Sequence, residues 1–379
     1  MKHIYIFDET LSNAAVFGVG TYVKLLLNIL NDIPLRITVV KLYSTSEELI
    51  IEYVNNIRYI FIPSLTPEYA SRIHYYSSVS FILLPFISLN DTNIFHHNYF
   101  ICGELFVILK KYYPNSYSLL TVHYRNSIKT RNDSNIKLLI NDYCDKVIVL
   151  TNKAALSLCE DYSTPRSKVE IIPNCVYDNY STSFIDKDKI KSLLGIDKNK
   201  KILLYVGRFD SNKNPYLLLR AFLNLIKIDS NIHLILVGKG NYDSLFNLIE
   251  TNWANITLTG FLEPEQLYSF YSIANIGIIP SYYEEFGYVA LEMLMFGIPI
   301  IANRTGGLEE IIEDGISGRL LDLYIDEKYS EEILKNAIIE ILLDDAKQLY
   351  YSTNARKRYL ENYKIEKFKS KMLDIYNGF

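Results

Sequence analysis

The sequence has few of the features that mark secreted, metal-binding or membrane-spanning proteins. Its 379 residues include four cysteines, which are scattered and form no C-x-x-C pair. We therefore expect reduced core thiols and no metal site. No apolar run reaches the ~20 residues that cross a bilayer, and the chain enters a strand pattern at once, so we expect no signal peptide. These absences favour a cytoplasmic protein. Peripheral association with the inner membrane face is compatible with them but not required.

Basic residues are not in excess either. Lysine and arginine number 39 against 43 aspartates and glutamates, which gives a net charge of −4. This balance argues against nucleic acid as a partner, and it means that any phosphate must be bound by a few placed cations. Hydrophobic residues make up 49% and charged residues 22%, an ordinary globular composition. The length exceeds what one hydrophobic core usually serves, so two domains are expected.

Short β-branched runs alternate with longer helical patterns, which is typical of βα units and a parallel sheet. In the first half, the predicted strands span residues 4–7, 36–42, 58–62, 79–84, 118–122, 146–150 and 169–172. In the second half, they span residues 202–206, 233–237, 256–259, 276–279, 298–302 and 319–321. The sequence therefore predicts an α/β protein with two successive Rossmann-like sheets and a hinge near residues 174–200.

The most informative stretch is S-Y-Y-E-E-F-G-Y-V-A-L-E-M-L-M-F-G-I-P at residues 281–299. It follows a predicted buried strand, so its loop lies at the carboxyl edge of the sheet, where open α/β folds bind ligands. Glu284 and Glu292 would repel phosphate there, but they suit the hydroxyl groups of a sugar or a ribose. Free N–H groups at a helix start suit phosphate oxygens. The donors expected here are the amides of Phe286, Gly287, Tyr288 and Val289. A nucleotide-sugar needs both kinds of partner.

Two cations stand on another predicted loop of the same edge. Gly207 and Arg208 follow the strand at 202–206, and Lys213 precedes Asn214–Pro215, which resembles an N-cap and first helical residue. Arginine can bind phosphate bidentately and lysine adds a point charge. The alternative is a pair of solvated loop cations. For Asp186-Lys-Asp188, we favour capping of a helix over metal binding.

Candidate residues in the first half are fewer. His123 ends the strand at 118–122, and His96 and His97 are nearby competitors. Gly18 and Gly20 precede a predicted helix at 21–30, where glycine would let the backbone approach a ligand. The pair fails as a dinucleotide fingerprint because the third glycine is missing and the next strand ends without an acidic residue.

The stretch at 281–299 resembles the E-x7-E signature of the retaining GT-B glycosyltransferases of family 4. Four further elements are similar to motifs of that family: V-G-R-F-D-S-N-K at 206–213, V-G-K-G at 237–240, G-G-L-E-E at 306–310 and D-G-I-S-G at 314–318. They cover roughly residues 200–322, and the first half matches loosely.

The resemblance implies the GT-B fold, with two facing Rossmann-like domains and a deep interdomain cleft. The N-terminal, acceptor-binding domain would span 1–178 and be completed by a C-terminal helix at 356–379. The nucleotide-sugar-binding domain would span 179–355. The catalytic residues implied are His123, Arg208, Lys213 and Glu284. The donor-binding residues implied are Gly18, Gly20, Gly207, Gly238, Phe261, Phe286, Gly287, Tyr288, Val289 and Glu292.

The function implied is retaining, metal-independent transfer from a nucleoside-diphosphate sugar, without a cofactor, in bacterial glycan, glycolipid or glycoconjugate synthesis. Base contacts in this fold are largely made by backbone, so the sequence does not identify the base. The donor that we expect is a UDP-sugar, with a GDP-sugar as the alternative. The sequence does not identify the acceptor, for which a sugar, a lipid-linked group, a peptide and a small molecule remain alternatives. Three departures stand out, namely Glu285, Asn214 and Cys175 at positions where the family has glycine. A GT-B phosphorylase or synthase, and an inactive binding-only homologue, remain alternatives.

Overall fold

A computed structural model describes residues 1–8, 18–31, 33–64, 72–98, 103–123, 137–178, 186–323 and 326–379. The chain divides into two compact units, which are described separately. Unit 1 comprises Met1–Asn174 and Phe368–Phe379, and unit 2 comprises Cys175–Lys367. The domain prediction drew its boundaries at residues 178 and 356, so it grouped the stretches 175–178 and 356–367 with unit 1.

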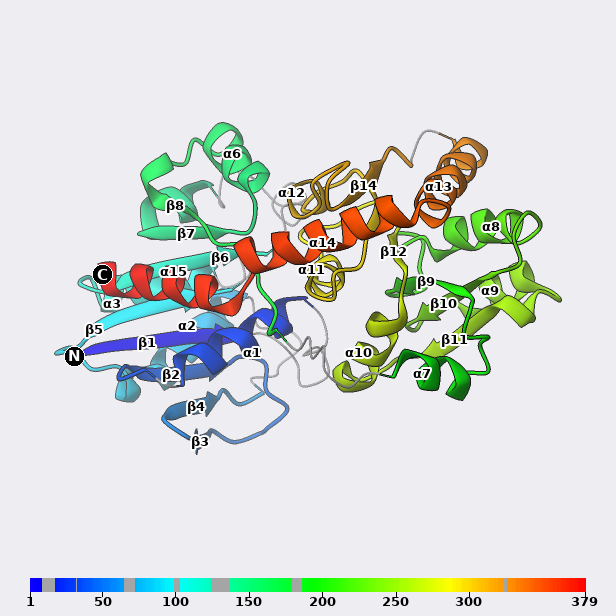
Figure 1. The fold of residues 1–379 in the computed structure, drawn as a ribbon. Helices are drawn as coiled ribbons and strands as arrows, with labels where there is room; N and C mark the ends of the chain where they lie inside the picture. Colours follow the sequence, from blue (N-terminus) through cyan, green and yellow to red (C-terminus); the bar gives the residue numbers. More distant parts are fainter. Residues whose placement is uncertain are drawn as a thin grey trace. The chain divides into compact units, whose positions relative to one another are not determined.

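Unit 1 is built on an eight-stranded sheet in the order β3-β4-β2-β1-β5-β6-β7-β8 (Figure 1). All neighbouring strands are parallel except the β3–β4 pair. The strands are β1 (Lys2–Asp8), β2 (Arg36–Lys41), β3 (Ile50–Val54), β4 (Ile57–Phe61), β5 (Thr92–His97), β6 (Tyr117–Val122), β7 (Lys146–Val149) and β8 (Val169–Ile171). Strand order reverses between β1 and β5, which makes the carboxyl ends of these strands a topological switch point.

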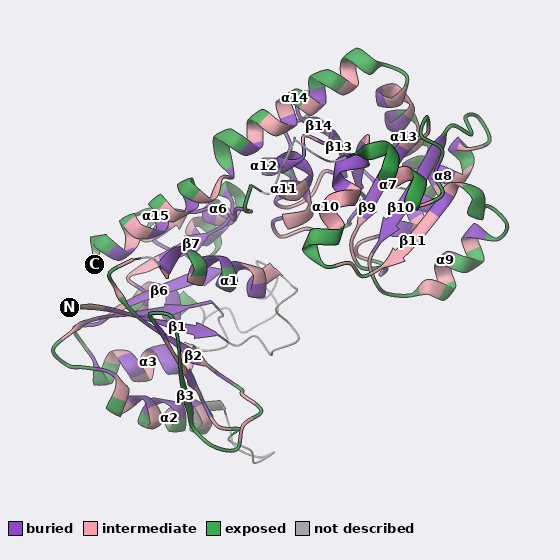
Figure 2. Ribbon diagram, turned by 60° about the horizontal axis from the view of Figure 1, so that its bottom comes forward, coloured by how far each residue is buried: buried purple, intermediate pink, exposed green. Residues whose placement is uncertain are grey.

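Helices cover both faces of this sheet (Figure 2). The helical segments are α1 (Gly18–Leu30), α2 (Arg72–Leu83), η1 (Leu84–Phe86), α3 (Gly103–Tyr112), η3 (Leu139–Tyr143), α6 (Asn152–Asp161), η4 (Arg166–Lys168) and α15 (Ile365–Gly378). Successive strand residues point to opposite faces. Tyr5 and Phe7 of β1 thus pack with α2 and α3 in one core cluster. On the other face, Tyr22 of α1 lies edge-on to Phe368 of α15.

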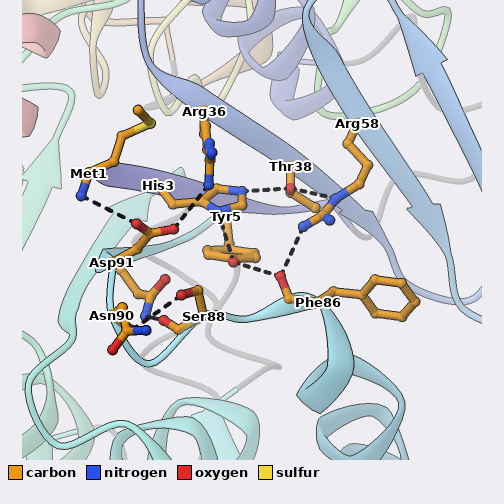
Figure 3. Close-up of polar contacts among 11 residues, drawn as sticks. Met1, His3, Tyr5, Arg36, Thr38, Arg58, Phe86, Ser88, Asn90 and Asp91 are labelled. Atoms are coloured by element: carbon orange, nitrogen blue, oxygen red, sulfur yellow. Dashed lines mark hydrogen bonds and ion pairs between the residues drawn. The ribbon is translucent and has the colours of Figure 1, made fainter.

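A network of hydrogen bonds joins the amino ends of neighbouring strands in the unit 1 sheet (Figure 3). Arg58 Nε donates to Thr38 Oγ1 at 3.0 Å, and Thr38 Oγ1 lies 2.8 Å from His3 Nε2. Tyr5 Oη donates its one proton to the Phe86 carbonyl. Tyr5 Oη therefore accepts from His3 Nδ1, which lies 3.0 Å away. Burial lowers the pKa of His3 to about 4, which keeps the ring neutral and this proton arrangement intact. The network stabilises the edge of the sheet opposite the carboxyl ends of its parallel strands.

One strand prediction for unit 1 is wrong, and two of its strands were not predicted. The apolar run at 79–84, predicted as a strand, lies in α2 and η1, because a short apolar run fits a buried helix equally well. The true fifth strand, T-N-I-F-H-H, was not predicted, because two histidines and an asparagine hide its apolar pattern. The exposed edge strand β3 was also missed. The other predicted strands of both halves are confirmed.

Unit 2 contains a six-stranded, fully parallel sheet in the order β11-β10-β9-β12-β13-β14 (Figure 1). Its strands are β9 (Lys201–Val206), β10 (Ile232–Val237), β11 (Ile256–Gly260), β12 (Ile276–Ile279), β13 (Ile300–Asn303) and β14 (Gly318–Leu321). The chain proceeds outward from β9 through β10 to β11, then returns to the other side of β9 with β12. The switch point therefore lies between β9 and β12.

The helical segments of unit 2 cover this sheet on both faces (Figure 2). They are α7 (Lys187–Leu193), α8 (Pro215–Leu225), α9 (Tyr242–Ile249), η5 (Trp253–Asn255), α10 (Pro264–Ile273), α11 (Tyr288–Met295), α12 (Leu308–Ile311), α13 (Glu327–Leu342) and α14 (Asp345–Asn362). Side chains of α8, α9 and α13 form one core cluster with the strands. Helix α11 packs so closely on β12 that a Cβ at Gly277 would lie 2.3 Å from Met293 Sδ.

The C-terminal helices explain the difference in domain boundaries. Arg356 of α14 donates to both carboxylate oxygens of Asp178 at 3.0 and 2.7 Å, and to the Met295 carbonyl of α11 at 2.6 Å. Tyr359 donates to the Val176 carbonyl at 2.9 Å. The C-terminal half of α14 and the connection after Asn174 thus belong to unit 2, and only the last residues of the chain join unit 1.

Two smaller predictions concern caps and cysteines. Asp186 caps α7 by accepting from the Lys189 amide at 3.0 Å, as predicted. Cys144 and Cys175 are buried free thiols and Cys159 is half-buried, whereas Cys102 lies outside the described residues. In the part of the chain that the structure describes, no helix is both long enough and apolar enough to cross a membrane.

Candidate active site

Three predicted catalytic residues of unit 2 lie on the loops that flank its switch point. The loop after β9 carries Arg208 and Lys213, and the loop after β12 carries Glu284. Because β9 and β12 are hydrogen-bonded neighbours, their carboxyl ends meet at one edge of the sheet. The loops also contact each other directly, since the Tyr282 amide donates to the Asn212 carbonyl at 2.7 Å and Asn212 Nδ2 to the Tyr283 carbonyl at 3.1 Å.

Asp210 organises the loop after β9, a role that the sequence reading missed. Its carboxylate accepts from Arg208 Nε at 2.7 Å and from the Lys213 amide at 2.8 Å. Burial works against the charge, but these donors hold the pKa of Asp210 below its ordinary value. Asn214 follows in the left-handed region (φ 50°) and caps α8, with its side chain accepting from the Leu217 amide. Asparagine tolerates this conformation, so the replacement of the family's glycine is structurally accommodated.

Lys213 and Glu284 form an ion pair across the two loops. Lys213 Nζ contacts Glu284 Oε1, and Ser281 Oγ donates to the same oxygen at 2.9 Å. The side chains of Lys213 and Glu284 are 22% and 15% exposed, so the pair is shielded but still open to solvent. A phosphate-binding cation and a hydroxyl-binding carboxylate are thereby placed side by side. Their assigned roles remain predictions.

The two glycines of the G-G-L-E-E motif pack against the backbone of Glu284. Gly307 donates its amide to the Glu284 carbonyl at 3.0 Å. Gly306 adopts φ 51°, and a Cβ there would lie only 1.7 Å from the same carbonyl oxygen. A side chain at this position would displace the backbone of the loop after β12. The motif is therefore explained by close approach of two backbones.

Helix α11 begins at the predicted phosphate-binding amides. Gly287, in the left-handed region (φ 116°), is the N-cap, and it supplies no side chain to cap the helix. Tyr288 and Val289 occupy the first two helical positions, while Phe286 is buried. The first N–H groups of a helix lack intrahelical acceptors, so this end can receive an anion. Glu285, whose charge stood out in the sequence, is bound by Tyr283 Oη.

Glu292 lies one turn further along α11 and has a partner that the sequence did not reveal. Tyr271 Oη of α10 donates to Glu292 Oε2 at 2.6 Å. Burial raises the pKa of Glu292 to about 7, against the lowering effect of this hydrogen bond. Glu292 itself retains intermediate accessibility, whereas Tyr271 is buried. Strand β12 and its loop separate Tyr271 from Glu292 along the chain, so no rule of sequence spacing would have paired them.

The remaining donor candidates of unit 2 lie on two further loops, Gly238 after β10 and Phe261 after β11. Gly238 has φ 148°, and a Cβ there would lie 1.8 Å from the Gly207 carbonyl oxygen, so the two glycines fix the approach of neighbouring loops. The Gly238 amide donates to the Gly260 carbonyl at 2.9 Å. Phe261 is 39% exposed, with Lys239 Nζ 4.7 Å from its ring centre. An exposed aromatic ring beside backbone amides can stack on a nucleobase.

In unit 1, the structure separates the three candidate histidines. His123 is 6% exposed, and its ring meets Tyr22 edge-on at 4.6 Å. Within the described residues, its Nε2 has no hydrogen-bond partner. Burial lowers the pKa of His123 to about 3, so the ring is neutral. His96 is bound on both nitrogens, by Thr121 and by Tyr376. His97 lies in the core between two phenylalanine rings.

The predicted glycine loop is partly helical. Gly18 is the first residue of α1 and Gly20 is buried within it, whereas the helix was predicted to begin at residue 21. The segment that precedes it, residues 9–17, lies outside the described residues. Among the described residues, no group of three or more His, Cys, Asp or Glu could hold a metal ion.

Comparison with known structures defines the class of fold. The chain is similar to sucrose-phosphate synthase from Thermosynechococcus elongatus, with a TM-score of 0.79 and 22% identity, covering 100% of this chain and 99% of that one. It is also similar to HepE of Anabaena in complex with UDP-glucose, with a TM-score of 0.76, 18% identity and full coverage of both chains. The protein has the GT-B fold, with two Rossmann-like units.

Sequence comparison then adds a family match for unit 2. Residues 186–358, within unit 2, match the family described as glycosyl transferases group 1. The resemblance to GT-B glycosyltransferases is thereby confirmed. An uncharacterized glycosyltransferase of Methanocaldococcus jannaschii is 27% identical over 237 residues, which cover 61% of this chain and 59% of the relative. The chain thus matches about three-fifths of that relative, and the match does not define an acceptor.

Proposed function

We propose that the protein is a retaining glycosyltransferase that moves a sugar from a nucleoside-diphosphate sugar to an acceptor hydroxyl in glycan, glycolipid or glycoconjugate synthesis. The observation that carries this proposal is the Lys213–Glu284 pair at the switch point of unit 2. It combines a cation for phosphate with a carboxylate for sugar hydroxyls, beside the start of helix α11. Neither solvated loop cations nor a purely structural loop would require this combination.

In the proposed site, the diphosphate rests on Arg208, Lys213 and the first amides of α11. Glu284 accepts hydrogen bonds from the transferred sugar, and Glu292 from the ribose. Cleavage of the bond between the anomeric carbon and the phosphate oxygen leaves additional negative charge on the diphosphate. The two fixed cations stabilise that charge, which is the role that a metal ion fills in other transferases. We therefore propose that transfer needs neither a metal nor a cofactor.

For retention of configuration, we propose attack from the face that the phosphate leaves. The acceptor oxygen forms its bond to the anomeric carbon as the carbon–phosphate-oxygen bond breaks, and the acceptor proton passes to the departing phosphate. His123 and the Gly18–Gly20 segment remain predicted contacts that rest on family resemblance. The donor is proposed to be a UDP-sugar, since HepE was solved with UDP-glucose, with a GDP-sugar as the alternative.

A donor screen tests the proposal. The full-length protein is incubated with UDP-, GDP- and ADP-sugars, a mixture of candidate acceptor glycans, and either excess EDTA or added Mg²⁺ and Mn²⁺. We expect release of one nucleoside diphosphate that EDTA does not abolish, with product of retained anomeric configuration. Turnover only with orthophosphate and a disaccharide would indicate a phosphorylase. Activity that EDTA abolishes and metal restores would overturn metal independence.

A further inference from the structure

The two motif carboxylates of unit 2 share one arrangement. Each has one oxygen held by protein donors: Glu284 Oε1 by Lys213 and Ser281, and Glu292 Oε2 by Tyr271. For the second oxygen of each, no hydrogen bond is made within the part of the chain that the structure describes. A carboxylate offers about four acceptor positions. Each side chain is thus anchored at one oxygen and has the other oxygen left for a ligand.

We propose that Tyr271 is a positioning residue for nucleotide recognition. By holding Glu292 Oε2, it presents Oε1 to the ribose hydroxyls and makes the site prefer a ribonucleotide to one without these hydroxyls. This inference rests on the proposed function, in which Glu292 faces the ribose.

Tyr271 is itself fixed in place. Its side chain is 1% exposed, and its ring stacks on Phe296 at 5.4 Å between ring centres. Phe296 is the C-terminal cap residue of α11, the helix that carries Glu292. The phenol therefore bridges α10 and α11 by a ring contact and by a hydrogen bond. A donor fixed in this way restricts rotation of the Glu292 carboxylate, and binding a hydroxyl then orders fewer groups.

The hydrogen bond also favours the acceptor form of the carboxylate. Burial raises the pKa of Tyr271 well above its ordinary value, so the phenol stays a donor at neutral pH. Its hydrogen bond lowers the pKa of Glu292, against the larger opposing effect of burial. Without the phenol hydroxyl, the same carboxylate would be less well oriented and more readily protonated. Both changes weaken its acceptance of hydrogen bonds from a diol.

The experiment compares a nucleoside diphosphate with its 2′,3′-dideoxy counterpart. Calorimetry on the full chain first identifies which of UDP, GDP and ADP binds best, and the dideoxy form of that nucleotide is then measured. Variants are Tyr271→Phe, which keeps the stacked ring, and Tyr376→Phe as the control. Tyr376 is an equally buried tyrosine of unit 1 whose hydroxyl lies 2.7 Å from His96 Nδ1. Its loss matches the removal of a buried hydroxyl without touching Glu292.

We expect wild-type protein and Tyr376→Phe to prefer the ribonucleotide by about 10-fold or more, and Tyr271→Phe by about 2-fold. KM for the donor should rise in Tyr271→Phe, while kcat stays within about 3-fold, because ribose contacts are made in ground and transition states alike. Glu292→Gln should lose the same preference, and adding Tyr271→Phe to it should change nothing further.

The outcomes distinguish failure of the inference about Tyr271 from failure of the proposed function. A strong ribose preference that persists in Tyr271→Phe overturns the inference and leaves the proposed function intact. If the wild type binds the ribonucleotide and its dideoxy counterpart equally well, both the role assigned to Glu292 and the inference about Tyr271 are overturned. The proposed transfer activity is then tested separately by the donor screen. Absence of binding by all three nucleotides, together with absence of transfer, overturns the proposed function itself.

Discussion

Replacing Glu292 with glutamine should stabilise the protein without ligand while weakening its nucleotide site. Burial raises the pKa of the Glu292 carboxyl from 4.5 to about 7. At pH 8, the carboxylate is charged in both the folded and the unfolded chain, and the fold bears the full cost of burying that charge. Glutamine has similar shape and keeps an oxygen that can accept from Tyr271, but it carries no charge.

The size of the effect follows from the pKa difference. A shift from 4.5 to about 7 corresponds to roughly 3 kcal/mol at 1.4 kcal/mol per unit. Because Glu292 retains intermediate accessibility, we expect a smaller net gain, about 1–3 kcal/mol. The sign depends on pH. Below about 4.5 the group is protonated in both states and the two proteins should differ little. Between about 4.5 and 7 the unfolded chain releases its proton first, so the wild type loses stability relative to the variant.

Melting curves at pH 5 and pH 8 measure this difference. At pH 8 without ligand, Glu292→Gln should unfold a few degrees above the wild type, and at pH 5 the gap should shrink. With a saturating nucleoside diphosphate, the wild type should gain more than the variant. Glu361→Gln, which removes an exposed carboxylate paired only at 3.9 Å, is the control and should shift little. A variant that is less stable than the wild type at pH 8, or equally stabilised by nucleotide, would refute this reasoning.

Three further predictions concern the neighbouring loops of unit 2. Lys213→Ala and Arg208→Ala should each lower kcat by about 10² or more, as expected for loss of a placed electrostatic group, and near-normal steady-state rates would exclude that role. Glu284→Gln should reduce turnover but tighten nucleoside diphosphate binding about 3- to 10-fold, because Lys213 loses its partner; calorimetry showing weaker binding would contradict this. Gly306→Ala should destabilise by about 2–4 kcal/mol through collision with the Glu284 carbonyl. Gly315→Ala, also at positive φ but with no atom within 4 Å, should cost about 1 kcal/mol, and equal unfolding midpoints would argue against the collision.

The architecture could be predicted because apolar strands and chemical motifs alternate along the chain. Loop residues such as Lys213 and Glu284 were placed at one sheet edge because each stands on the loop after a predicted strand, and the structure brings them into contact. The start of α8 was also predictable, since Asn214–Pro215 is a capping pattern that the structure confirms. Local rules of this kind hold because the responsible atoms are close in sequence.

The errors have equally specific causes. The run at 79–84 was assigned to a strand because its apolar residues fit both a buried strand and a buried helix. Strand β5 was missed because polar side chains interrupt it, and His97 is buried by tertiary contacts with aromatic rings. The hydrogen bond between Tyr271 and Glu292 joins two helices separated by a strand, so it depends on packing. Asp210 could have been found, because an aspartate three residues before Lys213 can accept from its amide.

The central claim is that unit 2 holds a nucleoside diphosphate between the cations of the loop after β9 and Glu292 of α11. Calorimetric titration of UDP, GDP and ADP into the wild type, Lys213→Ala and Glu292→Gln tests it most directly, with Lys227→Ala on an exposed surface as the control. The account predicts one nucleotide bound per chain, with affinity reduced about 10-fold or more by either site variant and unchanged in the control. Tight nucleotide binding that neither Lys213→Ala nor Glu292→Gln weakens would contradict it.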